Sequence, residues 1–284
     1  MLHSVRQRWR RRYWVPKAET ARFAGLRPVT VVTGASEGIG RALAGEFARA
    51  GHELLLVARN ADNLAAVAAE LAPARVQILT ADLATEAGCD AVEVELERIA
   101  ACCNILVNNA AIGLGGLFVE QPLADLARLA DLNMRAVTGL TRRFLPGMLA
   151  RGDGGVLNVA SLGGLMPTPH QAAYYASKAY VLSLTEALAH ETAGQGVRIS
   201  VLVPGPVATL FHARMGTEHS YYLAALGVMS ATQVAQAGYR GFRRGRTVIY
   251  PGLFTYFNAM ALRFLPHWLM IPVLGWMLQR RQAG

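Results

Sequence analysis

Thr33-Gly34-Ala35-Ser36-Glu37-Gly38-Ile39-Gly40 is the stretch of sequence that decides the fold. An apolar run at 28–33 precedes it and predicts a buried strand, and a helical pattern at 39–50 follows it. The three glycines permit a tight turn and a close approach of the backbone to a ligand. Because the first turn of a helix offers free N–H groups and the positive end of its dipole, the stretch predicts a pyrophosphate-binding turn.

A second interpretation of the same turn starts from Ser36. The segment Gly34-Ala35-Ser36-Glu37-Gly38 also fits G-x-S-x-G, the nucleophile elbow of α/β-hydrolases. That elbow normally follows several strands, whereas one strand precedes Ser36, and no His-Gly-Gly-Gly oxyanion segment comes before it. The nucleotide-binding interpretation is therefore favoured, and a hydrolase is kept as an alternative.

Strand and helix patterns alternate along the rest of the chain. Apolar runs predict strands at 54–57, 76–79, 105–107, 155–159 and 197–203, and helices are expected at 61–72, 86–101, 122–149 and 172–193. Parallel strands that are joined by helices are covered on both faces. We therefore expect an α/β fold in which a doubly wound parallel sheet of about seven strands forms one Rossmann-type domain over residues 28–252.

The end of the second strand indicates which dinucleotide would bind. A site for NAD places an acidic residue about 20 residues past the glycines, on the ribose 2′-hydroxyl. Here Arg59 stands 19 residues after Gly40. A guanidinium suits a 2′-phosphate, which an acid would repel, so the sequence favours NADP(H). A solvated arginine at a strand end is the alternative.

The chemistry is predicted from Tyr174-Tyr175-Ala176-Ser177-Lys178, a Y-x-x-x-K pattern in which Lys178 is one of only two lysines in the chain. Positions i and i+4 share one face of a helix, so the Tyr174 phenol and the Lys178 ammonium are expected side by side, with Tyr175 facing away from Lys178. A nearby cation favours phenolate and lowers the pKa of a phenol. Tyr174 is then expected to exchange a proton with a carbonyl or alcohol oxygen.

Two further polar residues fit the same chemistry. Ser161 follows the strand at 155–159, and ligands meet an open α/β sheet at the carboxyl ends of its strands, so its hydroxyl is expected near the substrate oxygen. Asn133 lies in the middle of a predicted helix, where asparagine has poor propensity, and it can hold a water or a backbone group. A plain loop serine and an ordinary helix asparagine are the alternatives.

Together these residues resemble the short-chain dehydrogenase/reductase family in its NADP-preferring form. The resemblance covers about residues 28–210 and continues more weakly to Gly252. The motifs stand in the family's order: Thr33-Gly34-x-x-x-Gly38-x-Gly40, Asp82-Leu83, Asn108-Asn109-Ala110-Ala111, Asn133, Ser161, Tyr174-x-x-x-Lys178 and Pro204-Gly205-Pro206-Val207-Ala208-Thr209. Ala111 departs from the glycine of that motif and narrows the expected channel slightly.

The resemblance implies a role for each matching residue. Asn133, Ser161, Tyr174 and Lys178 are implied to be catalytic. Cofactor binding is implied for Gly34, Ser36, Glu37, Gly38, Ile39, Gly40, Arg59, Asp82, Leu83, Asn108, Asn109, Ala110, Tyr174, Lys178, Pro204, Gly205, Val207 and Thr209. In that set Asp82 and Leu83 would flank the adenine, residues 108–110 would line the cofactor channel, and Val207 and Thr209 would lie near the nicotinamide carboxamide. Residues 210–229, with Phe211, Tyr221, Tyr222 and Leu223, would form a substrate lid.

The net charge of +9 belongs to the two ends of the chain. Residues 1–27, a basic N-terminal arm, hold eight Lys/Arg and one acid, and residues 219–284 hold seven Arg and no acid. The middle is mildly acidic, so no nucleic-acid partner is expected; the ends are either solvated or meet an anionic membrane surface. The three cysteines show neither a disulfide pattern nor zinc-ligand spacing, so we expect no metal and a reducing, cytoplasmic compartment. The basic start lacks the apolar run of a signal peptide.

Residues 253–284 form an apolar C-terminal extension beyond the predicted domain. Between 253 and 278 the only charged residue is Arg263, and the length suffices to span a bilayer. Pro266, Pro272 and Gly275 interrupt the run, and prolines break backbone hydrogen bonding inside lipid. Three interpretations stay open, namely a substrate lid, an oligomer contact and a membrane-surface segment.

The sequence thus predicts an NADPH-dependent oxidoreductase that transfers a hydride between a nicotinamide and a ketone, an aldehyde or a secondary alcohol. The expected substrate is a small, apolar or lipid-like carbonyl or alcohol, and the expected assembly is a homo-oligomer, a dimer or a tetramer. The alternative from another class is a non-catalytic NADP-binding sensor or scaffold, which would have no need of Tyr174 and Lys178 together.

Overall fold

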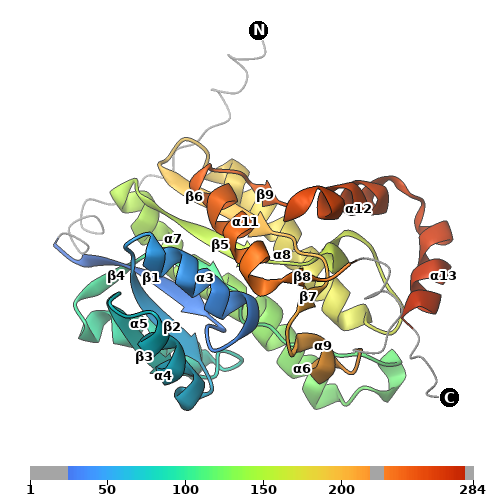
Figure 1. The fold of residues 1–284 in the computed structure, drawn as a ribbon, viewed down its shortest axis with the longest axis horizontal. Helices are drawn as coiled ribbons and strands as arrows, with labels where there is room; N and C mark the ends of the chain where they lie inside the picture. Colours follow the sequence, from blue (N-terminus) through green and yellow to red (C-terminus); the bar gives the residue numbers. More distant parts are fainter. Residues whose placement is uncertain (1–24, 218–226, 279–284) are drawn as a thin grey trace, which may run out of the picture.

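An open parallel sheet lies between two layers of helices (Figure 1). The computed structural model describes residues 25–217 and 227–278. Seven strands, all parallel to their neighbours, run in the order β3-β2-β1-β4-β5-β6-β9. The predicted doubly wound parallel sheet is therefore confirmed. The expectations for residues 1–24, for Tyr221, Tyr222 and Leu223, and for residues 279–284 lie outside the described residues.

The strands of the main sheet are β1 (Arg27–Thr33), β2 (Glu53–Ala58), β3 (Val76–Thr80), β4 (Ala101–Asn108), β5 (Gly154–Val159), β6 (Val197–Leu202) and β9 (Val248–Ile249). The short strands β7 (Val207–Ala208) and β8 (Met229–Ser230) form a second, two-stranded sheet. The helices are α3 (Gly38–Arg49), α4 (Ala61–Glu70), α5 (Glu86–Arg98), α6 (Leu123–Ala130), α7 (Ala136–Arg151), α8 (Ala172–Glu191), α9 (Phe211–Met215), α11 (Ala231–Arg243), α12 (Gly252–Phe264) and α13 (His267–Met277). Short helical turns occur at η1 (Phe118–Glu120), η2 (Asp131–Arg135) and η3 (Leu162–Leu165).

Both faces of the sheet are buried, which is why its strands read as continuous apolar runs. Helices α3, α4 and α11 cover one face, where the Phe47 ring meets the Tyr239 ring edge-on at 5.0 Å between centroids. Helices α5, α7 and part of α8 cover the other face around Leu140 and Met148. Because all the strands are parallel, their carboxyl ends lie along one edge of the sheet, between the two helix layers.

Three predicted elements need correction. The helix expected over 86–101 ends at Arg98, because Ala100 takes a left-handed conformation with φ of 49° and residues from Ala101 onward pair with β1. The strand expected at 105–107 accordingly begins at Ala101. The helix expected over 122–149 is interrupted by η2, a π-helical turn that contains Asn133. Insertion of an extra residue in a helical turn often marks a functional position.

The chain after β9 forms two helices at one end of the molecule, on the right in Figure 1. Helix α12 packs through Ala259 against Leu162 of η3. Helix α13 follows after a break at Pro266. Across the described ranges, we find no helix with both the length and the apolar character required to cross a bilayer.

Candidate active site

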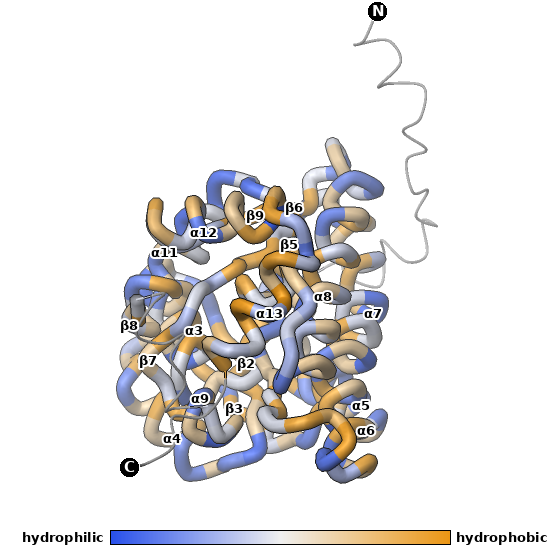
Figure 2. Tube along the Cα trace, turned by 90° about the vertical axis from the view of Figure 1, so that its right-hand side faces the viewer, coloured by the Kyte–Doolittle hydropathy of each residue, from blue (hydrophilic) through white to orange (hydrophobic). Residues whose placement is uncertain are grey.

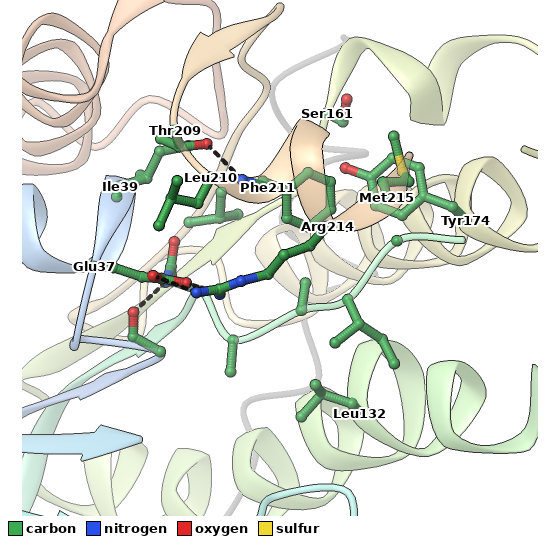
Figure 3. Close-up of a pocket in the computed structure, with 18 of the residues that line it drawn as sticks. Glu37, Ile39, Leu132, Ser161, Tyr174, Thr209, Leu210, Phe211, Arg214 and Met215 are labelled. Carbon is green, nitrogen blue, oxygen red and sulfur yellow. Dashed lines mark hydrogen bonds and ion pairs between the residues drawn. The ribbon is translucent and has the colours of Figure 1, made fainter. Parts of the chain in front are cut away.

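A pocket of about 800 Å³ opens at the carboxyl ends of the central strands. One part of its wall is the turn between β1 and α3 together with the ends of β2 and β3. The other part comes from the segments after β4, β5 and β6, from the start of α8 and from α9. Figure 3 shows Glu37 and Arg214 in one part of this pocket and Ser161, Tyr174 and Met215 in another, with Phe211 between them. Since β1 lies between β2 and β4, the pocket sits where the strand order reverses, the usual ligand position in such sheets.

The glycine turn is shaped for close approach. Gly34 and Gly38 have φ values of 64° and 55°, in the left-handed region that favours glycine. A Cβ added at Gly34 would lie 2.8 Å from Ala110 Cα, and one at Gly38 would lie 3.1 Å from Thr209 Cγ2. A Cβ at Gly40 would collide with the carbonyl oxygen of Gly34. The turn therefore keeps the first N–H groups of α3 open toward the pocket.

Asn109, directly after the neighbouring strand β4, and Thr33, the last residue of β1, hold this turn in place. The Asn109 amide donates hydrogen bonds to the carbonyl oxygens of Thr33 (3.0 Å) and Gly34 (3.1 Å). The Thr33 hydroxyl donates to Val107 O and accepts from the backbone N–H groups of Asn109 and Ala110. Asn109 and Ala110 line the pocket, as expected, and Asn109 also braces the glycine turn.

The ends of β2 and β3 bring Arg59, Asp82 and Leu83 to the pocket wall. The Asp82 carboxylate accepts from Arg128 of α6 at 2.8 and 3.0 Å and from the Ala84 N–H. Burial acts to raise the pKa of Asp82, but the hydrogen bond from Arg128, the Ala84 N–H and the charges of Arg128 and Arg59 outweigh it, so the pKa is lowered overall. Asp82 is thus a carboxylate acceptor at neutral pH.

Tyr174 and Lys178 lie one turn apart near the start of α8, and both line the pocket. The Lys178 ammonium is 5.8 Å from the centre of the Tyr174 ring, and both side chains are buried. Lys178 Nζ donates a hydrogen bond of 2.9 Å to the carbonyl oxygen of Val159, at the end of β5. Burial lowers the pKa of Lys178 from 10.5 to about 8. The expected juxtaposition of a phenol and an amine is therefore present.

Ser161 and Asn133 occupy different positions relative to the pocket. The Ser161 hydroxyl accepts the Gly163 N–H at 3.0 Å, and the residue lines the pocket after β5. Asn133 is buried outside the lining, where its amide pairs with both backbone groups of Ile112, at 2.8 and 3.0 Å. Asn133 also donates to Ser177 Oγ, which in turn donates to Tyr174 O. It therefore holds a backbone group, one of the two expected possibilities.

The expectation that Asn108 lines the cofactor channel needs correction. Its side chain is buried inside the sheet and donates to Asn158 Oδ1 (2.9 Å) and Thr141 Oγ1 (3.1 Å). Asn158 passes the network on to Thr185 of α8. Successive side chains on a strand point to opposite faces, so Asn108 turns toward one helix layer. Gly40 likewise shapes the turn without lining the pocket.

Several lining residues were not predicted. Tyr175 reaches the pocket beside Gly163, and Met215 of α9 packs with Tyr174. Arg214 of α9 forms an ion pair with Glu37 of the glycine turn. The stretch from Pro204 to Phe211 follows β6 into the pocket, as expected for residues 204–209. The Arg214–Glu37 contact joins residues far apart in sequence, so no spacing pattern could have found it.

The comparisons with known proteins agree with this geometry. The model of the short chain dehydrogenase family matches residues 28–219. The chain is 33% identical over 180 residues to the ketoacyl reductase HetN of Nostoc sp., covering 63% of each chain. It is 34% identical over 193 residues to a very-long-chain 3-oxoacyl-CoA reductase of Anas platyrhynchos, covering 65% of this chain and 61% of that one. The matched region thus spans about three fifths of the length of these two relatives.

A solved structure extends the similarity beyond the matched region. The short-chain dehydrogenase of Sphingobium yanoikuyae in complex with NADPH aligns with a TM-score of 0.75 and 34% identity. The alignment covers 91% of this chain and 98% of the other. Sequence motifs, strand order and pocket all lead to the same assignment, and the chain belongs to the short-chain dehydrogenase family.

Proposed function

We propose that this chain is an NADP(H)-dependent oxidoreductase that transfers a hydride between a nicotinamide and a carbonyl or alcohol carbon. The observation that carries the proposal is the pairing of Tyr174 with Lys178 at the wall of a pocket that also contains the glycine turn. A phenol beside a buried amine is equipped for proton exchange, and an open helix N-terminus is equipped for phosphate. One pocket therefore offers both halves of the reaction.

The residues on the pocket wall fit a dinucleotide phosphate. Gly34, Gly38 and Gly40 leave the space that a Cβ would fill, and they expose the α3 N-terminus to a pyrophosphate. At the end of β2, where a site for NAD has an acidic residue, this chain has Arg59. Its guanidinium suits a 2′-phosphate. The NADPH bound to the Sphingobium relative supports this choice. The remaining proposed cofactor contacts are Ser36, Ile39, Asp82, Leu83, Ala110, Pro204, Gly205, Val207 and Thr209.

The cofactor, when bound, supplies the hydride, and the protein supplies protons and alignment. Tyr174 gives its phenolic proton to the carbonyl oxygen, and the Ser161 hydroxyl donates a hydrogen bond to the same oxygen. The Lys178 ammonium stabilises the phenolate that is left behind. Asn133 is a positioning residue, since it fixes the backbone of Ile112, which lines the pocket.

The substrate end of the pocket favours an apolar molecule. Its wall includes Leu114, Tyr175, Leu210, Phe211 and Met215. Pockets of this kind take a largely hydrophobic ligand whose orientation is fixed by a few polar groups. The relatives from Nostoc and Anas, a ketoacyl reductase and a very-long-chain 3-oxoacyl-CoA reductase, support a ketone or aldehyde on an apolar chain. We also propose that the enzyme is cytoplasmic. We propose that it assembles as a homo-oligomer, a dimer or a tetramer.

Two alternatives are less well supported. A nucleotide-binding sensor needs the glycine turn but not a phenol beside a buried lysine. A hydrolase with Ser36 as nucleophile conflicts with the family to which the chain belongs. Consumption of NADPH in the presence of a carbonyl compound therefore distinguishes the proposal from both alternatives.

Oxidation of NADPH in the presence of ketones and aldehydes of increasing chain length tests the function. Tyr174→Phe should bind NADPH like the wild type, measured by fluorescence titration, and lose at least 100-fold in kcat, the usual scale for a lost general acid. Tyr180→Phe is the matched control, because Tyr180 lies on the same helix, outside the pocket lining. Undiminished turnover by Tyr174→Phe would refute the assignment.

A further inference from the structure

Helices α12 and α13 expose their large apolar side chains and bury small residues, the reverse of the usual pattern. Ten of the nineteen exposed large apolar side chains in the described ranges fall between residues 253 and 276. Small residues such as Ala259 and Gly275 face the domain instead. A helix on a globular protein normally turns its apolar stripe inward. We call these ten outward side chains the α12–α13 surface; they are Leu253, Phe254, Tyr256, Phe257, Phe264, Leu265, Trp268, Leu269, Val273 and Trp276.

The α12–α13 surface lies at one end of the molecule. Both helices occupy the right-hand end in Figure 1, and Figure 2 views that end face-on, with orange, apolar stretches in both helices. Phe264 and Trp268 are 82% and 77% exposed, on either side of the break at Pro266. A contiguous set of exposed apolar side chains of this size is uncommon on a soluble monomer and indicates a binding surface.

Charge indicates what covers this surface. No aspartate or glutamate occurs between residues 219 and 284, while seven arginines do. Four of them belong to α11 or the turn after it, Arg263 of α12 pairs with Glu186 of α8 at 3.1 Å, and Arg280 and Arg281 come shortly after α13 in the sequence. Tryptophan, phenylalanine and leucine combined with arginine are the composition of helices that lie in the interface of an anionic bilayer. A second copy of this chain would bring the same positive segment against itself. An anionic lipid surface complements both the apolar and the charged groups.

The surface also borders the substrate end of the pocket. Ala259 of α12 packs with Leu162, which lines the pocket. A Cβ added at Gly275 of α13 would lie 3.2 Å from Pro169, which is two residues before Gln171 on the pocket wall. None of the described residues of α12 or α13 lines the pocket itself. The two helices therefore frame the substrate side without closing it.

We propose that the α12–α13 surface docks on an anionic lipid bilayer and holds the substrate end of the pocket beside it. The aromatic side chains lie at headgroup depth, and the net positive charge of the sequence after residue 218 attracts the anionic headgroups. An apolar carbonyl substrate then passes from the bilayer to the pocket over a short distance. This last step rests on the proposed function, whereas the docking does not.

Vesicle flotation of the full chain tests the docking. Vesicles of phosphatidylglycerol with phosphatidylcholine should carry the protein upward, vesicles of phosphatidylcholine alone should carry much less, and salt of about 0.5 M should release it. Phe264→Glu and Trp268→Glu should each lower the partition coefficient at least about tenfold. Val94→Glu is the matched control, because Val94 is a 62% exposed apolar residue on α5, outside this end of the molecule.

The same samples separate docking from the proposed function. NADPH oxidation with a short, water-soluble ketone should be equal in the wild type and all three variants, which also shows that they fold. If no protein, wild type included, consumes NADPH while flotation behaves as described, the docking stands and the function falls. Flotation unchanged by both aromatic substitutions would overturn the docking. So would absence of flotation together with a wild-type dimer that Trp268→Glu splits into monomers in light scattering, since the surface would then be a subunit contact.

Discussion

Arg214 on α9 and Glu37 on the glycine turn form a two-pronged ion pair across the pocket, although 177 positions separate them in sequence. One nitrogen–oxygen distance is 2.9 Å, and the second contact is shorter. Figure 3 shows the guanidinium reaching over the pocket to the carboxylate. The pair places an acid at the helix N-terminus that would hold a pyrophosphate, and it offsets that acid with a base from α9.

This relationship predicts a charge-dependent defect. Arg214→Ala leaves the Glu37 carboxylate unbalanced beside the phosphate position, so NADPH should bind about tenfold more weakly, a loss of roughly 1.4 kcal/mol. The double variant Glu37→Gln with Arg214→Ala removes both charges and should return to within about threefold of the wild type. Isothermal titration with NADPH at low and moderate salt measures both, and the defect should shrink as salt rises. A double variant as weak as Arg214→Ala would mean that the arginine acts through contacts other than its charge balance.

Arg59 predicts the preference between cofactors. Its guanidinium stands at the end of β2 on the pocket wall, where a 2′-phosphate would add negative charge. Arg59→Asp should lower kcat/KM with NADPH at least about 100-fold and leave or raise that with NADH, because the carboxylate repels the phosphate and accepts from a ribose hydroxyl. Initial rates with both cofactors at one carbonyl concentration give the ratio. An unaltered ratio would remove Arg59 from the cofactor site.

Gly40 predicts a steric requirement in the glycine turn. A methyl group there would collide with the Gly34 carbonyl and the Asn109 amide, so the turn would have to open. Gly40→Ala should weaken NADPH binding at least about tenfold and lower the free energy of unfolding by about 1–3 kcal/mol, the usual cost of overpacking. Gly139→Ala is the control, because a methyl group at Gly139 on α7 meets nothing within 4 Å. That change should leave NADPH affinity intact and stabilise the helix slightly. Equal NADPH affinity in both variants would contradict the close-packed turn.

The parts of the fold and site that the sequence predicted share a physical origin. The glycine turn and the Tyr174–Lys178 pair are local, since the turn geometry and the i, i+4 spacing are set within a few residues. The buried strands could be predicted because neighbours such as Val31 and Val32 are both buried, one under each helix layer. The correct predictions therefore concern features that residues close in sequence determine.

The features that escaped prediction depend on distant contacts. Asn108 and Asn109 are neighbours, and only the finished sheet decides that one braces the turn while the other joins Asn158 inside the core. The π-helical turn at Asn133 follows from its pairing with Ile112, a segment 21 residues away. Arg128 finds Asp82 only once α6 packs beside the end of β3. No periodicity reports such pairings in advance.

Lys178 carries a pH dependence that tests its burial. It is 5% exposed, and burial lowers its pKa from 10.5 to about 8. Below about pH 8 the amine is protonated in both the native and the unfolded chain, so the full cost of burying the charge is present. Between about pH 8 and 10.5 the unfolded chain keeps a proton that the native chain has released. The unfolded state then binds more protons, so the free energy of unfolding rises with pH through this window.

The comparison that isolates this effect is with Lys178→Met, which keeps the length of the side chain and removes the titration. We would measure urea unfolding of both cofactor-free proteins at about pH 7, 8.5 and 10. The free energy of unfolding of the wild type, relative to that of the variant, should increase by roughly 3 kcal/mol over the whole window. Groups remote from Lys178 titrate alike in the two proteins and cancel in the difference, and making the comparison in a Tyr174→Phe background removes the titration of the neighbouring phenol. Parallel pH profiles would mean that the amine keeps its ordinary pKa in the native protein. The ammonium would then be hydrated, and the proposed stabilisation of a Tyr174 phenolate by Lys178 would be weakened.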